Sequence, residues 1–328
     1  MRTLKLSSIR PSLPSVSPLR IRVTYFNWFL ALLFLALVLA DFFLARQVRL
    51  SGAEFGLGMV PWTRVALLAI AFVCYLWRPA PRLVDAAGLF LWSGMFVYPL
   101  WFLVLIAGRT RFGLVDRQLA EIDGWMHFST AYITHLVAQA PLLGICFLIV
   151  YASFTPMVIS AIAIPSLSGQ TAVSRRFVMA MIFAMLLTTI VFAFTPAAGP
   201  WTTEALQPSK IQAMITDYLL LLKSGVPLRA ELGRAAIVSF PSVHVAVAIL
   251  SAQALASVRS VKFPARILCI LVCISAITTG WHYGIDLLGG AVVALISRRL
   301  ATKVCGQLEE WDNRAPMWLG WRKKQGIH

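Results

Sequence analysis

Three ionisable side chains, His244, His282 and Asp286, stand at the ends of long apolar segments, where ionisable residues are costly and are usually retained for function. Asp286 follows His282 by four residues, so on a helix the two side chains share one face and can touch. A carboxylate in that position can hold one imidazole nitrogen and leave the other free as a nucleophile. His127 and His135 have no clustered partners, and we interpret them as ordinary interfacial residues.

The second histidine, His244, ends the sequence Phe-Pro-Ser-Val-His over residues 240–244. Pro241 and Ser242 suit the first turn of a helix, because proline lacks the amide that would go unpaired there and serine can cap the turn. Free amides at a helix start attract phosphate. Between His244 and His282 lie two apolar segments joined by a short basic turn. The chain would therefore cross the membrane and return, so we expect both histidines at the same membrane face.

The elements that position these residues are membrane helices. Of the 328 residues, 59% are hydrophobic and only 13% are charged, whereas an ordinary soluble domain is about 25% charged. Several apolar segments reach or approach the roughly 20 residues needed to cross a bilayer. We predict an all-α, polytopic membrane bundle with eight spans, at residues 24–45, 62–78, 86–107, 140–165, 176–195, 241–258, 263–280 and 283–301.

Two segments between the spans are too polar to cross a membrane. Residues 113–138 alternate apolar and charged side chains with helical spacing, and we expect them to lie in the membrane interface and to be followed by a short helix. The loop 196–240 contains a predicted helix over 204–223 that would lie on the bundle as a lid or interfacial helix. Its apolar side chains on one side are Leu206, Ile211, Ile215, Leu219 and Leu222.

The net charge of +16 is distributed as a membrane protein requires. With a cytoplasmic N-terminus, the cytoplasmic ends and loops carry 19 of the 29 Lys and Arg residues and 4 of the 13 acids, and the outer ones carry nearly balanced charge. This pattern explains the basic composition without nucleic acid as a partner. We expect a basic cytoplasmic tail (1–22), one membrane domain (23–301) and a second cytoplasmic tail (302–328).

The PSxH sequence and the HxxxD sequence, in this order and at one membrane face, resemble the second and third motifs of the type-2 phosphatidic acid phosphatase superfamily. The resemblance covers a six-helix core at about residues 88–300, with two further spans in front. Three segments look most like the branch that contains inositol phosphorylceramide synthases and related bacterial proteins; they are residues 115–123, 195–201 and 240–244.

The resemblance implies that His282 attacks phosphorus, that Asp286 orients it, that His244 transfers a proton to the leaving oxygen and that Ser242 binds the phosphate. It also implies a lipid phosphate substrate at the outer face of a multi-pass protein, here of a bacterial inner membrane with its site towards the periplasm. Because the nucleophile is a side chain, we expect no cofactor and no metal ion.

Three departures from the family pattern concern the phosphate site. The first motif, KxxxxxxRP, is not found, Ala276 stands where the family has arginine, and Val243 replaces the glycine of PSGH. Two expected cations are therefore missing. We predict that Arg234, ten residues before His244, replaces them, and the other outer candidates are Lys210, Arg229, Arg109 and Arg111.

Alternative functions stay open on the sequence. His244, His282 and Asp286 could instead bind zinc in a membrane hydrolase, although no HExxH motif occurs. A degenerate, non-catalytic lipid-binding or transport protein would be expected to show internal repeats, and none is visible. Between a phosphatase, which uses water, and a head-group transferase, which uses an alcohol, the catalytic residues do not decide.

Overall fold

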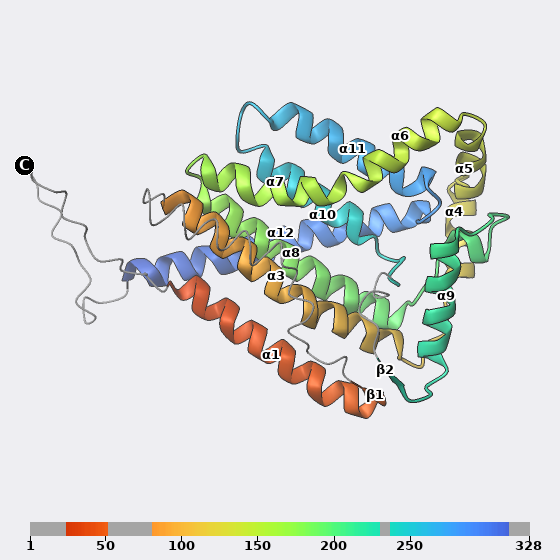
Figure 1. Cartoon of the computed structure of the whole chain (residues 1–328), viewed down its shortest axis with the longest axis horizontal. Helices are drawn as coiled ribbons and strands as arrows, with labels where there is room; N and C mark the ends of the chain where they lie inside the picture. Colours follow the sequence, from red (N-terminus) through yellow and green to blue (C-terminus); the bar gives the residue numbers. More distant parts are fainter. Residues whose placement is uncertain (1–23, 52–80, 230–236, 315–328) are drawn as a thin grey trace, which may run out of the picture.

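The chain forms a bundle of long helices with three shorter helices gathered at one end (Figure 1). The computed structural model describes residues 24–51, 81–229 and 237–314. Its helices are α1 (Tyr25–Gln47), α3 (Pro81–Gly108), α4 (Asp116–Trp125), α5 (Thr130–Ala138), α6 (Pro141–Ala152), α7 (Phe154–Leu167), α8 (Thr171–Phe194), α9 (Lys210–Lys223), α10 (Val243–Leu255), α11 (Lys262–Thr278) and α12 (Gly284–Arg314), with a 3₁₀ turn η2 (Pro200–Thr202).

The long helices confirm the all-α membrane bundle. Four apolar segments are long enough to cross a membrane, namely α1, α3, the continuous pair α6 and α7, and α8. The remaining predicted spans within the described residues coincide with α10, α11 and α12. The predicted span at 62–78 lies outside the described residues. α12 continues to Arg314, well past the predicted end of its span at 301.

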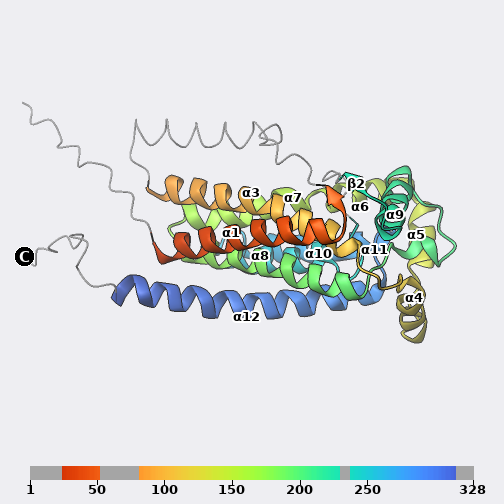
Figure 2. The same ribbon diagram turned by 90° about the horizontal axis from the view of Figure 1, so that it is seen from below.

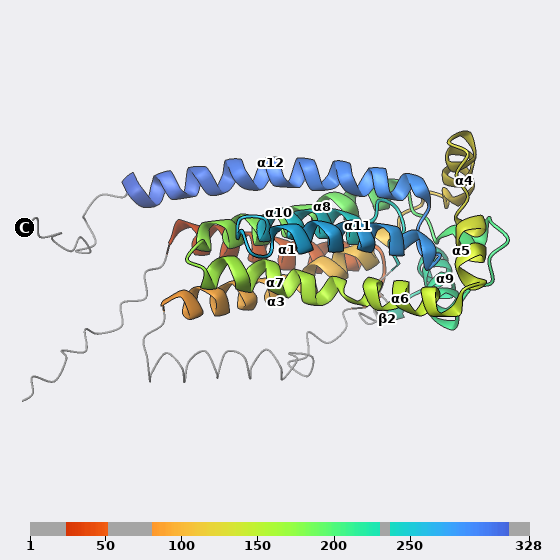
Figure 3. The same cartoon turned by 90° about the horizontal axis from the view of Figure 1, so that it is seen from above.

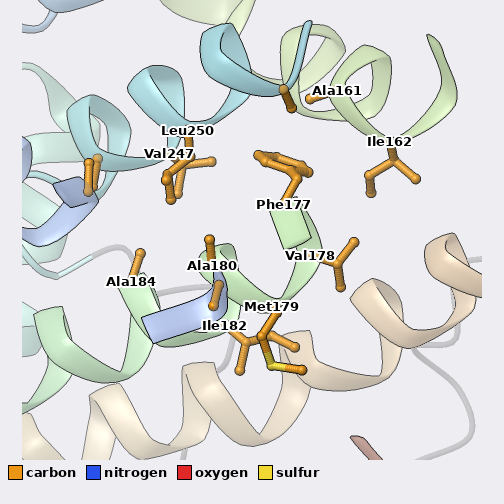
Figure 4. Close-up of a cluster of buried hydrophobic side chains, with 14 of the residues drawn as sticks. Ala161, Ile162, Phe177, Val178, Met179, Ala180, Ile182, Ala184, Val247 and Leu250 are labelled. Atoms are coloured by element: carbon orange, nitrogen blue, oxygen red, sulfur yellow. The ribbon is translucent and has the colours of Figure 1, made fainter. Parts of the chain in front are cut away.

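The core of the bundle is made by α8, which packs on α10 and α7 and presents small side chains between large ones. Figure 4 shows Phe177 and Ala180 of α8 directed towards Val247 and Leu250 of α10. These side chains are almost entirely buried. Such interdigitation gives close packing without voids, so α10, which carries His244, has a fixed place in the bundle.

α4, α5 and α9 lie across the end of the bundle at which α12 begins (Figures 1 and 2). α4 projects beyond the bundle on the side of α12, as Figures 2 and 3 show from opposite directions. At the same end, a short parallel pair joins β1 (Leu50–Ser51) to β2 (Leu228–Arg229). The bundle therefore has one end covered by helices that run across it.

The predicted helix over 204–223 is shorter than expected, because α9 begins at Lys210. Ser209 caps it, in a reciprocal pair with Gln212 that satisfies two amides at the helix start. The predicted inward side chains Ile215, Leu219 and Leu222 are buried, whereas Ile211 is exposed. Leu206 precedes the helix.

Candidate active site

His282 and Asp286 are in contact at the covered end of the bundle. Nδ1 of His282 lies 3.1 Å from Oδ2 of Asp286, and both side chains are buried. The same Oδ2 accepts the amide of Tyr283 at 3.0 Å and the hydroxyl of Ser239 at 3.0 Å. An ionised Asp286 can only accept hydrogen bonds. The imidazole of His282 therefore carries its proton on Nδ1, facing Asp286, and has a lone pair on Nε2.

This contact forms in a different way from the one expected. The spacing predicts that His282 and Asp286 share one face of a helix, but α12 begins at Gly284, two residues after His282. Asp286 reaches back over the helix start to the amide of Tyr283, as an acidic residue in the first turn of a helix commonly does. The His–Asp pair therefore spans the junction between a loop and a helix.

Ser242 joins the PSxH sequence to this pair. Its hydroxyl lies 3.2 Å from Nε2 of His282 and accepts the amide of Val245 at 3.3 Å, which makes Ser242 the N-cap of α10. Its own amide donates to the main-chain oxygen of Asp286 at 3.2 Å. The starts of α10 and α12 are thus bonded directly to each other.

His244, the second residue of α10, lies on the other side of the same space. The centre of its ring is 6.1 Å from that of His282. Its ring stacks on Tyr151 at 4.7 Å and contacts Phe154 at 4.6 Å, and its Nδ1 is 3.4 Å from the Tyr151 hydroxyl. With Nδ1 held by Tyr151, Nε2 is the atom left for proton transfer.

The cation predicted for the phosphate is not placed, because Arg234 lies outside the described residues. Among the alternatives, Lys210, Arg111 and Arg229 are exposed. Arg109 is different: it is 8% exposed, and none of its three guanidinium nitrogens has a hydrogen-bond partner within the described residues. His127 and His135 are both exposed.

Several residues at this site were not predicted. Ser239 and Tyr151 contact Asp286 and His244, and two carboxylates of α4, those of Asp116 and Asp123, bind the residues that follow His282. A usable signal existed for Asp116 and Asp123, since Asp123 follows Asp116 by seven positions, about two helical turns, and both therefore lie on one helix face. No local pattern marks Ser239 or Tyr151.

The comparisons with known proteins agree with the motifs. The sequence profile of the PAP2 superfamily matches residues 117–300. This chain belongs to the PAP2 superfamily. The matched segment contains His244, His282, Asp286 and Ser242, and the superfamily consists in general of phosphoesterases and phosphotransferases. No curated protein and no solved structure matches the chain.

Proposed function

We propose that this PAP2 protein is an integral membrane lipid phosphatase or phosphotransferase that works through a phosphohistidine on His282, at the outer face of the membrane. The observation that carries the proposal is the buried Asp286–His282–Ser242 chain of contacts, with His244 facing it. A nucleophile whose second nitrogen is fixed by a carboxylate is the arrangement that covalent catalysis by histidine needs.

In the first step, the lone pair on Nε2 of His282 forms a bond to phosphorus while the bond from phosphorus to the lipid oxygen breaks. His244, which starts this step protonated, gives that oxygen a proton from Nε2 and becomes neutral, and Asp286 stabilises the positive imidazole of His282. In the second step, His244 takes a proton from water or an alcohol, the freed oxygen attacks phosphorus, and the phosphorus–nitrogen bond breaks. His282 and His244 return to their starting states.

The phosphate would sit at the start of α10 rather than of α12. The first-turn amides of α12 are occupied, since Gly284 and Ile285 donate to Asp123. At α10, Val245 donates to Ser242, and the amides of Val243 and His244 remain for an anion. Ser242 can then exchange its contact with His282 for one with a phosphate oxygen.

An apolar groove next to the site supports a lipid substrate. It has a volume of about 370 Å³, and its lining comes from α8, from α12 and from the segment before Ser242. Pro241 and Ile285 belong to its lining, and their chain neighbours Ser242 and Asp286 belong to the site. The lining continues along α12 through Val292 to Ile296. A hydrocarbon chain in this groove would place its phosphate end beside His282.

Water is our preferred acceptor, since it needs no dedicated pocket, but one observation favours an alcohol. His282 is 3% exposed and Ser242 is 0% exposed, so the described residues would shield a phosphohistidine at this position from bulk water. This is the property expected of an inositol-phosphorylceramide-synthase-like head-group transferase. Addition of inositol or another polyol to enzyme and lipid separates the two, because a new polyol-bearing lipid would form only by transfer.

The test of the proposal uses the full-length chain purified in detergent, with phosphatidate and lipid pyrophosphates as substrates. We expect phosphate release, measured with lipid mass spectrometry, and none from His282→Ala. Wild-type protein that is folded but releases no phosphate and exchanges no head group on any of these lipids would contradict it. The outer orientation is tested separately with reporters fused after His328, which should report a cytoplasmic C-terminus.

A further inference from the structure

α4 has a buried face that carries two carboxylates. Asp116, Leu119 and Asp123 are 5%, 5% and 1% exposed, and their spacing of three and four residues places them on one side of the helix. On the opposite side, Arg117 and Glu121 pair with each other at 2.9 Å in solvent. Both buried carboxylates therefore face the protein, and their partners lie in other parts of the chain.

Asp123 caps α12 from outside. Its Oδ2 accepts the amide of Gly284 at 2.6 Å and its Oδ1 accepts the amide of Ile285 at 2.9 Å. These are the first two amides of α12, which have no acceptor inside the helix and which carry its partial positive charge. Burial raises the pKa of the Asp123 carboxyl above its ordinary value, and the two amide hydrogen bonds oppose that rise.

Asp116 holds the residue before that cap. Its Oδ1 accepts the hydroxyl of Tyr283 at 3.2 Å, and its Oδ1 and Oδ2 share the one amide of Ala198 at 3.1 and 3.0 Å. The amide of Gly199 also donates to Oδ1, at 2.8 Å. Since Tyr283 is completely buried, this end of α4 fixes both the loop after α8 and the residue that directly follows His282.

All three residues after His282 are thus bonded to α4. The main-chain oxygen of His282 itself accepts the hydroxyl of Thr130 at 3.0 Å, at the start of α5. His282 lies outside α12, so the direction of its ring depends on where the first turn of the helix is held. A displacement of about 1 Å at a reacting atom can lower a rate about a hundredfold.

We propose that Asp123 and Asp116 are positioning residues for His282: they hold the first turn of α12 so that Nε2 faces Ser242 and the phosphorus. The inference rests on the proposed function, in which His282 is the nucleophile. It predicts that loss of the α4 carboxylates lowers turnover and leaves substrate binding nearly unchanged, because neither side chain lies among the groups that would contact the lipid.

The test compares Asp123→Asn and Asp123→Ala with Glu121→Gln, a neutralised carboxylate on the exposed side of the same helix. We expect kcat to fall about tenfold in Asp123→Asn, which keeps one amide acceptor, and about a hundredfold in Asp123→Ala, with KM within about twofold of the wild type. Glu121→Gln should match the wild type. Asp116→Asn should behave like Asp123→Asn, since it also keeps an acceptor oxygen.

A second measurement is independent of the substrate. The imidazole ¹⁵N signals of His282, assigned by their loss in His282→Gln, should shift in Asp123→Asn and stay in place in Glu121→Gln. If the wild type acts on no lipid phosphate, the proposed function fails, and these signals alone decide the inference. If Asp123→Ala does not fold, Asp123→Asn carries the kinetic test. Wild-type kcat in folded Asp123→Asn, or unchanged His282 signals, would overturn the positioning role.

Discussion

Ser242 and Asp286 are bonded main chain to main chain, since the amide of Ser242 donates to the carbonyl oxygen of Asp286 at 3.2 Å. Through this bond, the residue that would bind phosphate and the residue that would orient the proposed nucleophile keep a fixed separation. The approach of α10 to α12 at this point depends on Gly290: a Cβ added there would lie 2.5 Å from the carbonyl oxygen of Ser242.

Gly290→Ala should therefore displace the start of α10, which carries Ser242 and His244. Because the obstructing atom belongs to the backbone, the start of α10 has to shift, at a cost of roughly 1–3 kcal/mol in unfolding free energy, and Ser242 moves away from His282. The matched control is Gly306→Ala in the same helix, where an added Cβ meets nothing within 4 Å. We expect lower melting temperature and lower phosphate release only for Gly290→Ala; equal behaviour of the two variants would contradict this packing.

His282→Ala should abolish turnover, because no covalent intermediate can form without the nucleophile. Asp286→Asn should lower kcat by about a thousandfold, because asparagine lacks the negative charge that stabilises the positive imidazole, and its NH2 group can donate to Nδ1 and so select the wrong tautomer. Phosphate release from purified variants measures both effects, and circular dichroism shows that the helices persist. Retention of wild-type rates by His282→Ala would refute the assignment of the nucleophile.

The spans and the His–Asp pair could be predicted because their signals are local. Each predicted span is a long apolar segment, and the spacing of four positions from His282 to Asp286 suffices to suggest contact. The predicted helix over 204–223 begins before α9 does, although Ser209 and Gln212 form a capping box that is visible in the sequence. The apolar periodicity extends to residues before this cap, and the cap, not the periodicity, determines where the helix begins.

The partners of the site residues could not be predicted from local patterns. Tyr151 and His244 are 93 positions apart, and Asp123 and Gly284 are 161 apart. Such contacts depend on how α4 and α6 fold back on the starts of α10 and α12, which helical periodicity does not determine. Spacing can show that Asp116 and Asp123 share a face, and only the tertiary structure shows what that face binds.

Among the predicted phosphate-binding cations that the structure describes, Arg109 is the one we expect to bind the phosphate, because a buried guanidinium with no hydrogen-bond partner among the described residues is unfavourable until an anion joins it. Arg109→Gln should weaken inhibition by inorganic phosphate and by vanadate about tenfold or more. Arg111→Gln, which changes an exposed neighbour, is the control and should leave both inhibition constants unchanged. Equal effects of the two substitutions would mean that the overall surface charge, and not a contact with Arg109, governs inhibition by these anions.

Activity should not depend on a metal ion, because the proposed nucleophile is an imidazole nitrogen and not a metal-bound water. We expect full phosphate release after dialysis against a chelator, and inhibition by vanadate, which imitates five-coordinate phosphorus. Activity that disappears with the chelator and returns with zinc would support the alternative in which His244, His282 and Asp286 act as ligands.

The groove between α8 and α12 predicts a dependence on lipid chain length. Val292 lines the groove and is 54% exposed, so Val292→Trp would fill part of it, whereas Leu295, 49% exposed on the same helix, lies outside the lining. If a hydrocarbon chain occupies the groove, Val292→Trp should raise KM several-fold for long-chain phosphatidate and leave KM for a short-chain analogue nearly unchanged, because the short chain does not reach Val292. Leu295→Trp, which adds the same side chain to the lipid-facing surface, should change neither value.

KM measured in mixed micelles at fixed surface concentration separates this effect from detergent partitioning. An equal change for both chain lengths, or for both tryptophan variants, would mean that the substrate chain lies elsewhere and that the groove holds only bulk lipid.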